Sequence, residues 1–107
     1  MKFVFVTLAL LVTTNGYASN IRGMGTDKCQ EYLNEKNSPS GHRVGIIFYA
    51  HWFMGFLTGV ESAGVAKIPS TVSAEILIGK LNYYCTQNPN QYVSDAAVQV
   101  AKEYQVR

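Results

Sequence analysis

Few side chains in this sequence could take part in covalent or metal chemistry. It contains two cysteines, Cys29 and Cys85, two histidines, His42 and His51, and seven scattered carboxylates. No nucleophile motif, Gly-rich phosphate loop or Cys-x-x-C zinc pattern accompanies them. We therefore expect no enzyme activity, no cofactor and no metal site. The covalent chemistry that we expect is a bond formed by the cysteines.

The first 18 residues have the pattern of a secretory signal peptide. Lys2 supplies a positive charge, residues 3–12 form an apolar run, and small residues stand at positions 16 and 18. We therefore predict cleavage between Ala18 and Ser19 and export to the periplasm. A membrane anchor is the alternative, but the apolar run is short, whereas a spanning helix needs about 20 residues.

In a short exported chain, an even number of cysteines indicates a disulfide. Cys29 and Cys85 can form only one bond within the chain. In the chain-entropy model, closing that loop of about 57 residues stabilises the fold by roughly 4 kcal/mol. Free thiols, or a bridge between two chains, are the alternatives.

The composition limits the partners of the mature chain, residues 19–107. Charged residues make up 15% of the sequence and the formal net charge is +2, so the dense basic patch of a nucleic-acid-binding protein is absent. The length suits one small domain. We expect protein partners, no nucleic acid, and no membrane association once the signal peptide is removed.

Helical periodicity runs through residues 26–104, and no strand pattern competes with it. We predict an all-α, compact four-helix single domain with one disulfide. A polar arm, residues 20–25, is expected to be loose. The predicted helices are residues 29–36, capped by Thr26 or Asp27; residues 42–62; a third that is capped by Ser70 or Thr71 and ends before Asn88; and residues 92–104.

The predicted helix 42–62 is unusual because no charged residue occurs from Val44 to Val60. Its own aromatic residues occupy most of its circumference. Its length and His51 argue against a membrane span, so we expect a buried central helix, with Gly55 and Gly59 letting neighbouring backbones approach. An adhesive exposed face is the other possibility. We interpret His51 as a core histidine, with a pH-sensing role as the alternative.

The motifs around the cysteines resemble the HdeA/HdeB group of small periplasmic acid-stress chaperones. The similarity rests on residues 29–33 (Cys-Gln-Glu-Tyr-Leu), on an aromatic central helix that contains Trp52, and on residues 84–89 (Tyr-Cys-Thr-Gln-Asn-Pro). It implies a disulfide between the first and third helices, a homodimer at rest, and an ATP-independent holdase that binds unfolded clients in acid.

A second group of helical periplasmic proteins shares an aromatic-glycine central helix and a disulfide. These are immunity proteins, which neutralise one effector protein, so an immunity or inhibitor protein is the alternative function. The resemblance supplies no motif for client or partner binding. From composition alone, the candidates are Tyr49, Trp52, Phe53 and Phe56.

Overall fold

The computed structural model describes residues 23–38 and 43–107. Its elements are a 3-10 turn and four α-helices: η1 (Gly23–Thr26), α2 (Cys29–Lys36), α3 (Arg43–Ser62), α4 (Ala74–Gln87) and α5 (Val93–Glu103). The all-α, four-helix fold with one disulfide is thus confirmed for these residues. The predicted signal peptide and its cleavage site between Ala18 and Ser19 lie outside them, as does the predicted start of the second helix at His42.

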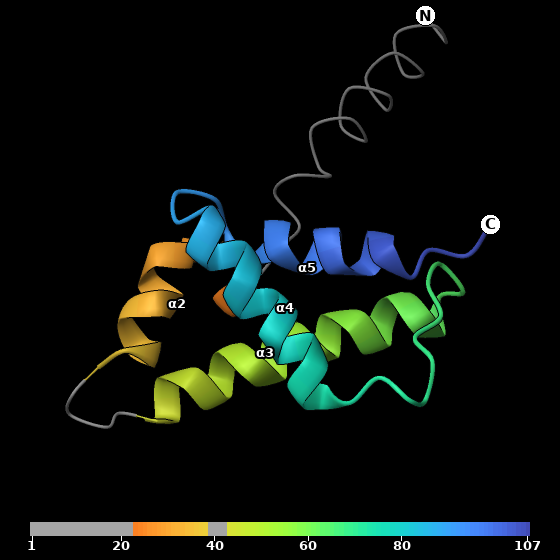
Figure 1. The fold of residues 1–107 in the computed structure, drawn as a ribbon, viewed down its shortest axis with the longest axis horizontal. Helices are drawn as coiled ribbons and strands as arrows, with labels where there is room; N and C mark the ends of the chain where they lie inside the picture. Colours follow the sequence, from red (N-terminus) through yellow and green to blue (C-terminus); the bar gives the residue numbers. More distant parts are fainter. Residues whose placement is uncertain (1–22, 39–42) are drawn as a thin grey trace, which may run out of the picture.

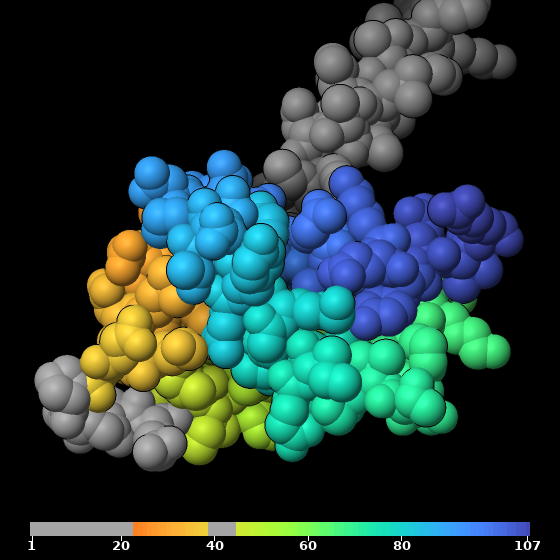
Figure 2. Space-filling model, in the orientation of Figure 1, coloured from red at the N-terminus to blue at the C-terminus, as the bar shows by residue number. Residues whose placement is uncertain are grey.

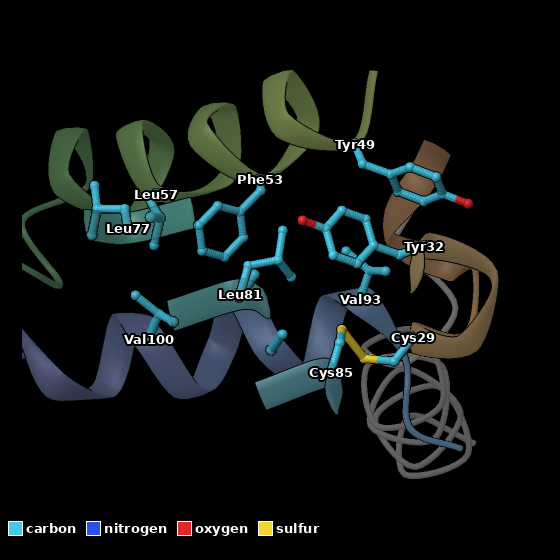
Figure 3. Packing of buried hydrophobic residues seen from close by; sticks show 12 residues of the cluster. Cys29, Tyr32, Tyr49, Phe53, Leu57, Leu77, Leu81, Cys85, Val93 and Val100 are labelled. Atoms are coloured by element: carbon cyan, nitrogen blue, oxygen red, sulfur yellow. A yellow bond between two sulfur atoms is a disulfide. The ribbon is translucent and has the colours of Figure 1, made fainter. Parts of the chain in front are cut away.

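The helices surround a single core cluster. In Figure 1, α3 and α5 run along the length of the molecule, α2 lies at one end, and α4 crosses in front of them. Figure 3 shows Phe53 and Leu57 from α3 pointing toward Leu81 of α4 and Val100 of α5. These apolar positions recur every three or four residues on their helices, so one face of each helix is buried.

The disulfide joins α2 to α4, as the resemblance implied. Cys29 and Cys85 form the bond, their Cα atoms are 4.9 Å apart, and both side chains are fully buried. Cys85 lies on the same face of α4 as Leu77 and Leu81. The bond therefore covalently fixes α2 at one end of the core.

Two helix starts differ from the prediction. The residue that caps α4 is Ser73, whose hydroxyl accepts a hydrogen bond from the Ile76 amide at 3.2 Å, so the prediction of Ser70 or Thr71 was wrong. The reason is a turn in which the Val72 amide donates to the Pro69 carbonyl, which delays the helix. Such a capping hydroxyl satisfies one of the first amides of the helix.

The first turn of α2 has no side-chain cap, so the prediction of Thr26 or Asp27 was also wrong. Instead, the Cys29 amide donates to the Gln91 carbonyl at 2.7 Å. The Val93 amide in turn donates to the Asp27 carbonyl at 2.9 Å, so the segments that precede α2 and α5 cross as a short antiparallel pair. Backbone carbonyls of a distant segment thus replace the expected cap.

Residues 23–25 of the segment predicted as a loose arm belong to η1, and residues 20–22 lie outside the described residues. The turn η1 packs against Trp52, and a Cβ added at Gly25 would lie 2.1 Å from the Trp52 ring. Only glycine fits such a close approach. The prediction of a loose arm was therefore wrong for residues 23–25, because the indole of α3 holds this turn in place.

Candidate functional site

The four aromatic residues nominated for binding do not form one exposed patch. Tyr49 and Phe53 are core residues, with 3% and 0% of their surface exposed. Trp52 and Phe56 are partly buried on the flank of α3, where their rings stack with centroids 5.6 Å apart. In the folded chain, a partner can therefore reach only the flank pair, and binding through these residues remains a prediction.

The opposite side of α3 is an exposed apolar surface. Ile47 and Phe48 keep 50% and 57% of their surface exposed, and the other members are small or weakly polar. We call this surface the outer face of α3; it consists of Ile47, Phe48, His51, Gly55, Thr58 and Gly59. Since Val44 to Val60 includes no Asp, Glu, Lys or Arg, His51 is the one ionisable side chain of this surface.

The outer face of α3 changes two expectations from the sequence. The helix is not covered on nearly all sides: outside α3 itself, no atom of the described residues lies within 4 Å of a Cβ added at Gly55 or Gly59. Gly45 is the glycine of this helix that is closely approached, with the Glu35 carboxyl carbon 2.8 Å from an added Cβ. The expected backbone contact at Gly55 and Gly59 is therefore wrong within the described chain.

His51 lies on the same surface and is exposed. Its interpretation as a core histidine was wrong, because the buried side of α3 is the one that carries Tyr49 and Phe53. A pH-sensing role for His51 remains a prediction. The homogeneous apolar pattern around α3 explains the error, since it does not indicate which side faces the core.

Two buried tyrosines, Tyr32 of α2 and Tyr49 of α3, link α3 to the neighbouring elements. The Tyr49 hydroxyl donates to the Asp27 carboxylate at 2.6 Å, and the Tyr32 hydroxyl donates to the side-chain carbonyl of Asn82. The two rings meet edge to face, with centroids 5.3 Å apart. These contacts tie α2 to α3 on one side and to α4 on the other.

Burial raises the pKa of Tyr32 to about 12. Burial also raises the pKa of Tyr49 above its usual value, and the hydrogen bond to Asp27 and the charges of Asp27, Glu31 and Glu35 act in the same direction. Both phenols are therefore protonated near neutral pH and serve as hydrogen-bond donors. Their role is to hold α2, α3 and α4 together.

Two hollows on the surface had no counterpart in the sequence interpretation. One is a groove of about 510 Å³ between α4 and α5, bordered by Ile76, Gly79 and Val100. The other, about 230 Å³, lies where Phe56 and Val60 of α3 meet Val98 of α5. The sequence signal for the groove between α4 and α5 is Tyr83, a large aromatic residue that lies outside the apolar row of α4.

Within the described residues, no three His, Cys, Asp or Glu side chains come together as a metal-binding group. No helix in the described ranges is long and apolar enough to cross a bilayer. No protein-family model matches the chain, and no curated protein or solved structure matches it either. The similarity to acid-stress chaperones and immunity proteins therefore remains a prediction from the motifs.

Proposed function

We propose that this chain is an exported, non-catalytic protein that binds one protein partner through the outer face of α3, as an immunity or inhibitor protein does. The observation that carries the proposal is that this uncharged apolar surface is already exposed in the folded chain. Contiguous apolar patches on small proteins are typical of interaction sites. A partner needs no opening of the fold to reach it.

Phe48 is the expected anchor of the interface. Covering about 100 Å² of its exposed ring would contribute roughly 2.5 kcal/mol. Trp52 follows one turn later on the same helix and supplies a second aromatic group at the edge of the surface. Aromatic anchors of this kind carry much of the energy of protein interfaces.

The rest of the surface is suited to close contact. Gly55 and Gly59 have open space above them, so the backbone of a partner can approach α3 there. The core residues Tyr49, Phe53 and Leu57 hold α3 in place, which keeps the entropic cost of ordering the site small. These features favour a preformed site for one partner.

A holdase chaperone is the second candidate, and the hydrogen bond between Tyr49 and Asp27 favours it. The acceptor of this bond is a charged carboxylate, and the charges of Glu31 and Glu35 also act on the phenol, so loss of the bond would release α3 from the segment that precedes α2. The contact between α2 and α3 would weaken. Tyr49 and Phe53, buried at neutral pH, would then become accessible to unfolded clients.

Capture from a periplasmic extract at pH 7 tests the first candidate. The immobilised chain is compared with two variants, Phe48→Ser and the control Tyr83→Ser, which changes an exposed aromatic residue on α4. We expect one stoichiometric partner that the wild type and Tyr83→Ser retain and that Phe48→Ser retains at least tenfold less, since about 2.5 kcal/mol of burial is lost. Equal capture by Phe48→Ser would contradict a site on the outer face of α3.

Light scattering of an acid-labile client at pH 3 and pH 7 tests the second candidate. The variant Tyr49→Phe lacks the hydroxyl that binds Asp27, so a holdase released by acid should act at a higher pH in this variant. Equal client aggregation with and without the protein at both pH values would exclude the holdase. Many clients captured only in acid would instead favour it over the first candidate.

A further inference from the structure

The groove between α4 and α5 is a second surface, separate from the outer face of α3. Its floor is Val100, a core residue, and its α4 wall includes Ile76 and Gly79. In Figure 2, α4 and α5 border each other on the face of the molecule that is in view. A volume of about 510 Å³ falls in the range of small-ligand sites.

The charges that line the groove cancel. Lys80 of α4 and Glu103 of α5 form an ion pair, with Nζ and Oε1 3.0 Å apart. The Lys80 ammonium also lies 5.9 Å from the centroid of the Tyr104 ring. The hydrogen bond to Glu103 raises the pKa of Lys80, so the ammonium stays protonated at neutral pH. A neutral ligand therefore fits this groove better than an anion or a cation.

Both hydrogen-bond donors and acceptors are present along the groove. Asn88 donates through Nδ2 to the Tyr84 carbonyl at 2.9 Å, which leaves its side-chain oxygen as an acceptor. The amide of Gln99, which is exposed, adds two donors and one acceptor. The second carboxylate oxygen of Glu103 is a further acceptor. A ligand rich in hydroxyl or amide groups can use all of these.

An exposed aromatic ring stands beside these polar groups. Tyr83 keeps 71% of its surface exposed, the largest fraction among the exposed large hydrophobic residues of the described chain. A flat ring in this position can stack on the C–H face of a sugar, while neighbouring amides bind its hydroxyl groups. Tyrosine suits such a site because it combines an apolar body with a polar tip.

We propose that the groove between α4 and α5 binds a neutral oligosaccharide. One sugar ring stacks on Tyr83, and its hydroxyl groups bond to Gln99 and Glu103. A peptide that binds as an added strand needs an exposed sheet edge, but both walls are helices whose backbone groups are already bonded internally. A proline-rich peptide would not need a sheet edge, and the experiment distinguishes it.

The test is a titration followed by the backbone amide spectrum of the folded chain. The probes are the tetramer of N-acetylglucosamine, the tetramer of glucose and a proline decamer. We expect at least one sugar to shift residues 76–88 and 99–103 with a Kd on the order of 1 mM, as is usual for a small ligand in an open site. No shift at the highest soluble sugar concentration would overturn the proposal, as would a larger shift in these residues with the proline peptide.

Two variants on α4 and one control make the test specific. Gly79→Leu fills the groove. Outside its own helix, no atom of the described residues lies within 4 Å of the added Cβ, and leucine favours a helix, so the fold should be retained. Tyr83→Ser removes the stacking ring. Both should weaken sugar binding at least tenfold, whereas Phe48→Ser on α3 should leave it unchanged. Sugar shifts that persist in Gly79→Leu would place the binding elsewhere and refute the site.

The outcome is independent of the function proposed for α3. Loss of protein capture in Phe48→Ser with normal sugar binding would separate the two surfaces. Sugar binding without any protein partner would refute the function proposed for the outer face of α3 and leave the groove as the binding site of the chain.

Discussion

The helices α3 and α5 contact each other along the core, but their outer sides differ. On α5, Val93, Ala96, Ala97 and Val100 are buried, and Lys102 and Glu103 face solvent. On α3, Tyr49, Phe53 and Leu57 are buried, but the outer face carries Phe48 and glycines instead of charges. Both helices therefore bury an apolar inner side in the core, but only α5 has a charged outer side suited to water.

This difference separates stability from function. The polar outer side of α5 needs no further explanation, whereas the apolar outer face of α3 contributes little to the packing of the chain itself. An apolar side chain on the surface is unfavourable in water. Where its substitution also leaves the fold unchanged, the side chain indicates an interface with a partner. The predictions below test whether the inner and outer sides of α3 differ as this comparison requires.

The largest effect is expected from alkaline pH, which acts on the inner side. In the unfolded chain phenols ionise near pH 10, whereas burial raises the pKa of Tyr32 to about 12 and raises that of Tyr49 as well. Unfolding therefore releases protons above pH 10, and the free energy of unfolding falls by up to about 1.4 kcal/mol per pH unit for each tyrosine. Urea denaturation at pH 8, 10, 11 and 12 measures this, and over the two pH units above 10 the two tyrosines together should cost up to about 5 kcal/mol. The decline should be shallower in Tyr49→Phe, and constant stability up to pH 12 would contradict it.

Two phenylalanines on α3 provide the most direct comparison. Phe53→Ala leaves a cavity in the core and should lower the free energy of unfolding by about 4 kcal/mol. Phe48→Ala on the outer face should change it by less than about 0.5 kcal/mol. Chemical denaturation followed by circular dichroism measures both. Similar losses in the two variants would mean that the outer face is part of the packed structure.

The disulfide should contribute next. Replacing Cys29 and Cys85 by serine should destabilise the chain by about 4 kcal/mol, because the unfolded state regains the freedom of a long loop. Thermal unfolding with and without reductant gives the same comparison in the wild type. An unchanged melting temperature after complete reduction would show that the core alone fixes α2.

A smaller loss is expected at the contact between η1 and α3. Gly25→Ala forces the turn away from Trp52, with an expected loss of about 2 kcal/mol. Because Trp52 is the only tryptophan of the chain, its fluorescence should shift to longer wavelength as solvent enters. Gly79→Ala is the control: outside its own helix no described atom lies within 4 Å of the added Cβ, so the emission should not shift and stability should rise slightly rather than fall. An unshifted emission in Gly25→Ala would place the turn elsewhere.

The smallest effect is a gain in stability. Gly55→Ala and Gly59→Ala should each raise the free energy of unfolding by about 0.5–1 kcal/mol, since glycine within a helix is unfavourable and open space surrounds both positions. The same variants should weaken capture of a partner that approaches α3 closely. Loss of stability in either variant would mean that another part of the chain covers these glycines.

The fold was predictable where the apolar residues repeat with helical spacing and lie on one side of the helix. The apolar row of α4 and its cysteine placed the third helix and the disulfide, and Asn88 marked its end. The orientation of α3 was not predictable, because Phe48 and Phe53 are the same residue type on opposite sides. Only the positions of α2, α4 and α5 determine which of them is buried.

The remaining differences have the same kind of cause. The turn η1 is glycine-rich and polar, and its order depends on Trp52, which lies far along the chain. The groove depends on how α4 crosses α5, which brings Tyr83 near Gln99. Residues close in sequence do not signal either contact. Neither the order of η1 nor the position of the groove could therefore be predicted from periodicity or motifs alone.

The crossing of residues 27–29 with residues 91–93 also determines when the chain can fold. Its hydrogen bonds join positions that are more than 60 residues apart, and α5 supplies the floor on which the other helices pack. A chain that emerges from its N-terminus first can therefore complete its core only when its last helix has been released. Until then the part of α3 that packs against α5 remains uncovered, and a factor that shields it during this interval would favour a high yield.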